Sequence, residues 1–567
     1  MRSSFVGGVP RDEYIVRLRA MIRGEGPVPA SDPPADPLAA LEPEVPPSAG
    51  PTPLDAGSPV DPEAETAAVV GRGGLAITFA KAYFILQGLV QQVLLPRVLG
   101  LDGYGALSSV LSASSITYNP IVTTSIQGVS RAVAQTKGAE QSATVRRTFL
   151  VHAALAVVAS SAFFVAAPYT AGFMRAPHIV APLRLVSLVL LLYGLYSPLI
   201  GALNGRRRFV AQASFDILFA TLRTTALVVG GYLAPAGQGV LGSIGGFVTV
   251  ALVIAVAAIA VVGIGKRGPG GPSALAHVAF ILPLLAGQVL LNLLLQADLT
   301  LLRRFAGDAA QAAGLPALAA DPLVGAYRAT QLYSFLPYQL LVSVTFVLFP
   351  LLATAHKAGD REAVARYVKA GVRIAMIVAG LLVCVTSGLS AQLLRLVYSP
   401  EVAELGARAM QTLTLGFGAF AILGVLTAVL SSIGREREGA TVIAVAFALV
   451  VALCFAWARG APFGEDLLRN TALSTSAGLV LAAVCAAVLV YRAAGSVVAL
   501  GSAVRVAASL AVAIFVARHL PLAGKIVTLA ECAAVALIYV AGLAASRELG
   551  GDDVAIVSRI VRRRRPG

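Results

Sequence analysis

Long apolar segments separated by short polar gaps dominate this chain and limit how it can fold. A membrane-spanning helix needs roughly 20 mostly apolar residues. The sequence holds fourteen such segments, at 73–95, 104–131, 147–169, 180–203, 209–234, 239–264, 276–302, 322–353, 366–392, 405–432, 438–458, 468–491, 497–517 and 524–546. Only 13% of the residues are charged, against about 25% in soluble domains. The sequence therefore predicts an all-α polytopic membrane protein with about 14 transmembrane helices.

Positive charge is concentrated in alternate gaps between these segments. Lysine and arginine cluster at 137–147, 206–208, 266–267, 357–361 and 435–437, whereas the gaps at 99–103 and 233–239 carry none. Basic loops stay in the cytoplasm by the positive-inside rule. We therefore expect both termini in the cytoplasm. The Pro- and acid-rich tail over 1–70 is predicted to be disordered, and a basic tail covers 547–567.

None of the gaps is long enough for a soluble catalytic domain, and the longest lies near 303–322. The nucleotide-binding, metalloprotease and serine-hydrolase motifs are missing. The four cysteines lie in apolar segments without disulfide or metal spacing, and the five histidines are scattered near segment ends without forming a cluster. The net charge of +15 belongs to the loops, so nucleic acid is not an expected partner. We expect a transporter rather than an enzyme, with no cofactor and no metal.

Two segments of the chain repeat each other. Residues 104–131 align with 324–351 at an offset of 220, which matches Gly105 with Gly325 and Tyr118 with Tyr338. The offset is an even number of spans, so the two copies have the same orientation. Parallel repeats are typical of transporters whose substrate site lies between two halves near the bilayer midplane. We predict an N-lobe over 72–267, a C-lobe over 275–491, and two additional spans over 497–546.

The runs that flank the repeat carry a family resemblance. The run LQGLVQQVLLPRVLGLDGYGALSSVLS, and LLQADLTLLRRFAG followed by VGAYRATQLYS, resemble the starts of the two lobes in polysaccharide exporters. These exporters are a branch of the multidrug/oligosaccharidyl-lipid/polysaccharide (MOP) exporter superfamily. The resemblance covers roughly 72–435.

This resemblance implies a function and a place in the cell. Members flip undecaprenyl-diphosphate-linked sugars across the bacterial inner membrane by alternating access. A count of fourteen spans is similar to that of the lipid II flippase and some polysaccharide flippases, in which the last two spans flank a groove for the lipid tail. The implied partners are a lipid-linked glycan, membrane lipids, and the polymerase and glycosyltransferases of polysaccharide assembly.

Polar side chains recur at helical spacing inside several apolar segments. In the second span Ser108, Ser112, Ser115 and Asn119 lie on one stripe. The other candidate substrate-binding residues lie in the first, fifth, seventh and eighth spans: Lys81, Gln92, Arg223, Gln288, Asn292, Gln296, Arg328, Gln331 and Gln339. Packing between helices is the alternative explanation for the Ser and Thr residues. The cations Lys81, Arg223 and Arg328 favour a site that attracts an anion such as a diphosphate.

Acidic residues inside the spans are the candidates for coupling or gating. Asp298 lies about 160° around the helix from Gln296, so we expect it to pair with a basic residue on a neighbouring helix, first of all Arg328. A protonatable coupling carboxylate is the alternative. Asp216 lies one heptad before Arg223, and Glu531 in the last span is expected to be structural.

Three other functions stay open at this point. A lipid II flippase would place several arginines in the first, second and eighth spans, whereas here the first span has one lysine. An ion-coupled multidrug exporter of the same fold would keep an acid there. A scaffold of an export complex would need no polar stripes. We predict a flippase for a polyprenyl-diphosphate-linked oligosaccharide.

Overall fold

The computed structural model describes residues 5–6, 9–10, 62–522 and 524–550, in two units, Met1–Glu65 and Thr66–Gly567. In the first unit the short strands β1 (Phe5–Val6) and β2 (Val9–Pro10) pair in antiparallel fashion. Most of the predicted tails, 1–70 and 547–567, lies outside the described residues.

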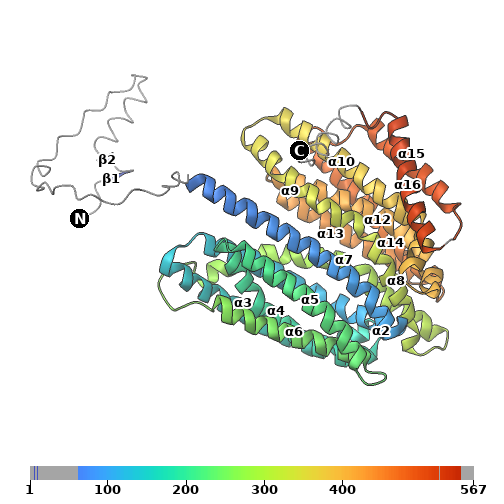
Figure 1. Ribbon diagram of the computed structural model, residues 1–567, viewed down its shortest axis with the longest axis horizontal. Coiled ribbons are helices and arrows are strands. Elements are labelled where there is room, and N and C mark those ends of the chain that lie inside the picture. Colours follow the sequence, from blue (N-terminus) through green and yellow to red (C-terminus); the bar gives the residue numbers. More distant parts are fainter. Residues whose placement is uncertain (1–4, 7–8, 11–61, 523, 551–567) are drawn as a thin grey trace, which may run out of the picture. The chain divides into compact units, whose positions relative to one another are not determined.

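The second unit is built from helices (Figure 1). They are α2 (Pro62–Ala134), α3 (Gly138–Phe173), α4 (Val180–Gly205), α5 (Phe209–Leu233), α6 (Gly239–Val262), α7 (Ala274–Ala312), α8 (Asp321–Ser334), α9 (Leu336–Lys357), α10 (Arg361–Gly388), α11 (Ser390–Val397), α12 (Pro400–Ser432), α13 (Glu436–Leu453), α14 (Glu465–Ala494), α15 (Leu500–Arg518) and α16 (Lys525–Ala545), with short turns η1 (Pro177–Ile179), η2 (Ala317–Ala320) and η3 (Cys454–Ala458). Within the described residues, 12 helices are long and apolar enough to cross a membrane. The predicted all-α polytopic fold is confirmed.

Helix α2 contains the first two predicted spans. Its apolar part, Ala76–Ala134, has 59 residues and would be about 90 Å long at the α-helical rise, three times the thickness of a bilayer core at roughly 30 Å. Gly100 interrupts it with φ 71° and ψ 174°, a conformation that only glycine adopts without strain. The hydroxyl of Tyr104 donates to the side chain of Gln92 across this break. Gly100 therefore divides α2 into two helical parts, which correspond to the first two predicted spans.

The eighth predicted span, 322–353, is divided into α8 and α9. The two helices have 14 and 22 residues and are separated by Phe335 alone. Pro337 is the second residue of α9, and its missing N–H removes one hydrogen bond of a continuous helix. With α8 and α9 taken as one pass, α2 as two and the eight-residue α11 left out, the helices match the fourteen predicted segments.

The predicted loop near 303–322 is wrong over its first half. Helix α7 continues to Ala312, well beyond the predicted end at 302. The polar residues of this extension have partners: Asp308 lies 2.7 Å from Arg175 and 3.9 Å from Arg304. Hydropathy alone predicts that the helix ends at 302. The ion pairs of Asp308 stabilise the helical residues beyond that point.

The buried apolar residues of the second unit form two separate cores. One contains residues between Leu95 and Val262, including Leu190 and Phe247. The other contains residues between Leu294 and Leu543, including Leu413 and Tyr539. In Figure 1, α3 to α6 lie on one side of α2 and α9 to α16 lie on the other. We call the helix ends next to the basic gaps the predicted cytoplasmic ends, and the opposite ends the predicted external ends.

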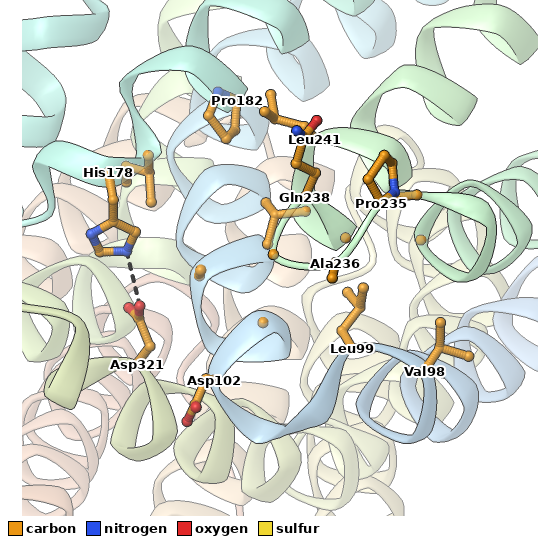
Figure 2. A pocket seen from close by; sticks show the side chains of 18 of the residues that line it. Val98, Leu99, Asp102, His178, Pro182, Pro235, Ala236, Gln238, Leu241 and Asp321 are labelled. Atoms are coloured by element: carbon orange, nitrogen blue, oxygen red, sulfur yellow. Dashed lines mark ion pairs between the residues drawn. The ribbon is translucent and has the colours of Figure 1, made fainter.

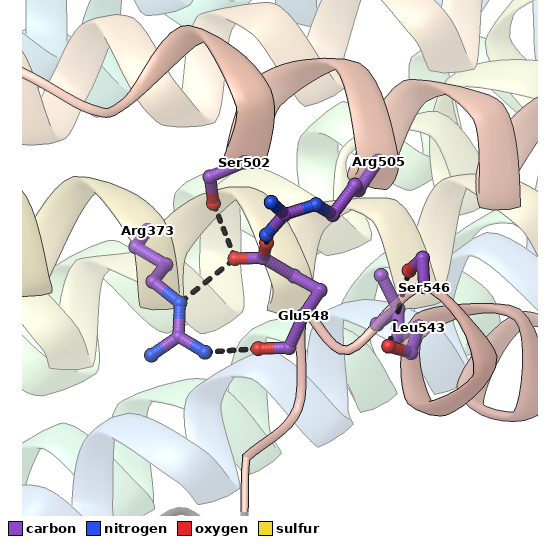
Figure 3. A network of polar contacts seen from close by, with 6 residues as sticks. All are labelled: Arg373, Ser502, Arg505, Leu543, Ser546 and Glu548. Carbon is purple, nitrogen blue, oxygen red and sulfur yellow. Dashed lines mark hydrogen bonds and ion pairs between the residues drawn. The ribbon is translucent and has the colours of Figure 1, made fainter.

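Hydrogen bonds and ion pairs connect helices α15 and α16 to α10 at their predicted cytoplasmic ends (Figure 3). Glu548, just after α16, is buried and accepts hydrogen bonds from Ser502, from Arg373 Nε at 2.8 Å and from Arg505 Nη1 at 3.1 Å. Burial raises the pKa of the Glu548 carboxyl, but the hydrogen bonds from Ser502, Arg373 and Arg505 outweigh burial, so that this pKa lies below its ordinary value. The folded state therefore favours the charged carboxylate.

Replacing Glu548 with glutamine is expected to lower the free energy of unfolding by about 1–2 kcal/mol near neutral pH, because a charged acceptor is removed from two partly exposed arginines. A depressed pKa stabilises the fold above the ordinary carboxyl pKa of 4.5, and this contribution is lost as the pH falls through the folded value. The gap in melting temperature between wild type and Glu548→Gln should therefore shrink in acid. Glu362→Gln, at an exposed helical pair with Arg366, is the control. A gap that stays constant in acid would contradict this assignment.

Candidate functional site

The second half of α2 and helix α7 run in opposite directions and meet through polar side chains at several levels. Asn119 Nδ2 donates to Asn292 Oδ1 at 3.0 Å, and Ser112 Oγ donates to Gln296 Oε1 at 2.9 Å. Asn292 also donates to the backbone oxygen of Gln288 at 2.9 Å. The stripes predicted on the second and seventh spans therefore face each other. In this conformation they form hydrogen bonds between helices.

At their predicted external ends the two lobes are packed backbone to backbone. A Cβ atom on Gly105 would lie 1.9 Å from the backbone oxygen of Asp321, and one on Gly325 would lie 2.6 Å from the backbone oxygen of Leu101. These two glycines are the pair that the internal repeat aligns. Their missing side chains allow α2 of one lobe to cross α8 of the other. We call this contact the external closure.

Three titratable side chains lie beside the external closure. Arg303 of α7 and Asp321 at the start of α8 are 0% and 1% exposed, with Arg303 Nε 3.1 Å from Asp321 Oδ1. His178 Nε2, from η1 of the other lobe, lies 2.8 Å from Asp321 Oδ2. Figure 2 shows this contact at the edge of a cavity of about 530 Å³, which Asp102 and Gln238 also line. The buried carboxylate of Asp321 therefore joins the two lobes.

Asp298 is bound by neutral donors. Its carboxylate accepts from Tyr327 Oη at 3.0 Å, from Gln331 Nε2 at 3.0 Å and from the backbone N–H of Leu299 at 2.7 Å. The predicted direct pair with Arg328 is wrong for the described residues, because Arg328 donates instead to Gln331 Oε1 at 2.8 Å. Tyr327 and Gln331 lie four residues apart on one face of α8, whereas Arg328 is rotated away and reaches Asp298 only through Gln331.

The three predicted cations have separate partners. Lys81 Nζ lies 3.7 Å from Asp216 Oδ2, and its side chain is 64% exposed. Arg223 lies over the Phe247 ring, 5.1 Å from its centroid. Arg328 belongs to the Asp298 network. They do not form one cluster in this conformation. Lys81 is exposed, whereas Arg223 and Arg328 are half-buried.

The other predicted residues are engaged or buried. Gln92 accepts from Tyr104. Gln331 and Glu531 are buried, and among the described residues one carboxylate oxygen of Glu531 and the side-chain oxygen of Gln339 have no hydrogen-bond partner. Tyr338, next to Gln339, lines a mainly apolar cavity of about 470 Å³ between α7, α9, α12 and α13, with its ring centroid 4.6 Å from that of Phe420.

Sequence reasoning missed two histidine contacts. His152 and His277 lie 3.1 Å apart between α3 and α7, and His152 Nδ1 lies 2.8 Å from Ser125 Oγ. His178 belongs to the Asp321 contact. The expectation that the histidines form no cluster is wrong for the first pair, which joins residues 125 positions apart. No group of three or more metal-ligating side chains occurs among the described residues.

Comparison with known proteins gives the family. A family model described as polysaccharide biosynthesis protein matches residues 70–356, just over half of the chain, and one described as MatE matches 317–456. No curated protein sequence matches the chain.

Solved structures share the fold at low identity. The lipid II flippase MurJ in an inward closed conformation is 13% identical, with 84% of this chain and 99% of MurJ covered and a TM-score of 0.66. An inward-facing multidrug resistance transporter of the MATE family is 15% identical, with 73% and 94% covered and a TM-score of 0.59. A MOP superfamily transporter from Pyrococcus furiosus is 14% identical, with 73% and 95% covered and a TM-score of 0.50. The chain therefore belongs to the polysaccharide biosynthesis protein family and has the fold of the MOP superfamily of membrane transporters.

Proposed function

We propose that this protein is a flippase that carries a polyprenyl-diphosphate-linked oligosaccharide from the cytoplasmic to the outer leaflet of the bacterial inner membrane. The family supports transport of a polysaccharide precursor. The choice of an anionic lipid rests on Lys81. An ammonium group that is 64% exposed inside an apolar span is costly in lipid, and a diphosphate compensates for that cost.

Asp216 balances Lys81 when no substrate is bound. At 3.7 Å the two groups are close but not at ideal hydrogen-bond distance. A diphosphate oxygen can replace the carboxylate as the partner of Lys81 and make shorter, charge-assisted hydrogen bonds. The polar stripes with Asn119, Asn292 and Gln296 supply amide groups for sugar hydroxyls once α2 and α7 separate.

Alternating access in this fold requires the external closure to open and form again. With the glycolipid loaded from the cytoplasmic side, separation of Gly105 from Gly325 would release it outward. Return of His178 to Asp321, which stays paired with Arg303 in its own lobe, would close the external end again. The apolar cavity beside Tyr338 has the right lining for part of an isoprenyl chain.

Lipid II flipping is the second candidate. MurJ, whose structure aligns over 99% of its length, is named as a lipid II flippase, and lipid II also carries a polyprenyl diphosphate. Both candidates predict the same role for Lys81. They differ in the glycan, so a transport comparison between lipid II and another diphosphate-linked oligosaccharide separates them.

Lys81→Gln is expected to slow glycolipid flipping in proteoliposomes by roughly 10- to 100-fold, because a hydrogen bond to a charged group contributes about 1.5–3 kcal/mol. Lys81→Arg should keep most of the activity. Lys266→Gln, which removes an exposed lysine from the loop before α7, is the matched control and should behave as wild type.

Asp216→Asn tests whether Lys81 acts only through its pair with Asp216. If Lys81 binds substrate, Asp216→Asn keeps flipping within a few-fold of wild type, since the cation is retained. Equal loss in Lys81→Gln and Asp216→Asn, with recovery in the double variant, would identify a structural ion pair and contradict the proposed role.

A further inference from the structure

A second cationic site lies at the predicted external end, away from the polar stripes. A cavity of about 340 Å³ is lined by Arg97 of α2, Arg395 of α11 and Lys525 at the start of α16, together with Tyr398 and Ser399. We call it the external cationic pocket. We propose that this pocket binds the phosphate group of a lipid in the outer leaflet.

The charges of the external cationic pocket are poorly balanced by the protein. Among the described residues, neither Arg97 nor Lys525 forms an ion pair, and Arg97 Nη2 donates only to the backbone oxygen of Val397 at 3.3 Å. Arg395 has one loose partner, Glu404, at 3.9 Å, and the two side chains are 42% and 70% exposed. Three cations around one cavity with one loosely held acid make a site for an anion.

The location of these cations does not follow from the rule that places positive charge on the cytoplasmic side of the membrane. The positive-inside rule accounts for arginine and lysine on the cytoplasmic side and predicts few of them at the opposite end. Here three are gathered at the predicted external end, from segments that lie roughly 130 and 300 residues apart in sequence. The rule that orients the protein does not account for three cations around one cavity, and an anionic ligand would account for this grouping.

Helix α16 indicates that the anion belongs to a lipid. Directly after Lys525, Ile526 is 84% exposed, and Leu529 and Leu537 further along are also exposed. These residues extend from the pocket along a span of the membrane protein, where an acyl or isoprenyl chain packs against them. A soluble anion would gain nothing from this apolar surface.

Two sources supply such a phosphate: the transported polyprenyl diphosphate after release, and a resident phospholipid such as phosphatidylglycerol. In either case the bound phosphate would join Arg97 of α2 to Arg395 of the other core. The inference goes beyond the glycolipid path and stands whichever glycan is transported.

The test is native mass spectrometry of the full-length protein with undecaprenyl diphosphate, phosphatidylglycerol or undecaprenol added. The triple variant Arg97→Gln/Arg395→Gln/Lys525→Gln is compared with Arg459→Gln/Arg469→Gln/Arg518→Gln. The latter removes the same charge from exposed positions at the predicted external end that do not line the pocket. Melting temperatures establish that both variants are folded.

We expect the pocket variant to bind one phosphate lipid fewer than wild type, or to bind it roughly tenfold more weakly, while the control triple variant binds as wild type. If the pocket variant loses binding of undecaprenyl diphosphate alone, the ligand is the transported lipid. If it loses binding of phosphatidylglycerol alone, the ligand is a resident lipid. If it loses binding of both, the pocket is a general phosphate site. Unchanged binding, an equal loss in the control, or an equal loss of undecaprenol overturns the proposal. If the wild-type protein binds these lipids as expected but flips no glycolipid, the external cationic pocket stands and the proposed function is wrong.

Discussion

Gly105→Ala is expected to abolish transport. The added Cβ would lie 1.9 Å from the backbone oxygen of Asp321, and backbone cannot move aside as the end of a flexible side chain can. Overpacking of this kind costs about 1–3 kcal/mol or more. The lobes must therefore separate at the external closure, and a transporter that cannot close one side cannot return to load its substrate.

The matched control for Gly105→Ala is Gly88→Ala in the same helix, where a Cβ would meet no atom within 4 Å. A cysteine introduced at Leu101, whose backbone lies against Gly325, reports opening through its reaction with a membrane-impermeant maleimide. The four native cysteines are replaced first. Gly105→Ala should raise the labelling of Leu101→Cys, and Gly88→Ala should not. Wild-type transport and labelling in Gly105→Ala would show that the closure is not needed.

Arg303→Met is expected to be the most destabilising single substitution among those considered. Arg303 and Asp321 are both almost fully buried and lie 3.1 Å apart, so removing the guanidinium leaves the buried carboxylate with His178, 2.8 Å away, as its remaining basic neighbour. Breaking a buried pair in this way costs about 3–5 kcal/mol. We expect a large fall in the melting temperature of the detergent-solubilised protein.

Two variants make the Arg303 result specific. Arg303→Met/Asp321→Asn removes both charges and should recover much of the lost stability, because a neutral amide is less costly to bury. Arg366→Met breaks an exposed pair with Glu362 and should change stability by at most about 1 kcal/mol. A double variant as unstable as Arg303→Met would contradict the buried-charge explanation.

The sequence was most informative where a residue's position follows from local periodicity. Apolar length and positive gaps predicted the helices, and the repeat identified Gly105 and Gly325 as equivalent. Helical spacing put Asn119 and Asn292 on polar stripes, and these stripes meet in the structure.

What the sequence could not supply is the register between helices. Nothing local indicates that Gly105 and Gly325 cross each other, or that His178 reaches Asp321 across 143 positions. Asp298 was assigned a charged partner because an intramembrane acid is costly, whereas Tyr327 and Gln331 meet that cost with neutral donors. Asp321 lies in the predicted gap near 303–322, because a charge at the end of an apolar segment resembles a boundary. It lies just before the repeat, which begins at 324, and its counterpart at the offset of 220 is the apolar Leu101, so the repeat gives no signal for it.

The proposed function is tested most directly by substrate choice in proteoliposomes that contain the wild-type protein. One assay follows the flipping of an undecaprenyl-diphosphate oligosaccharide, and a parallel assay follows the movement of a cationic dye. Movement of the glycolipid, its loss in Lys81→Gln and the absence of dye transport are the results that an anionic, lipid-linked substrate predicts. Transport of the dye without the glycolipid would contradict the proposal and favour a multidrug exporter with the same fold.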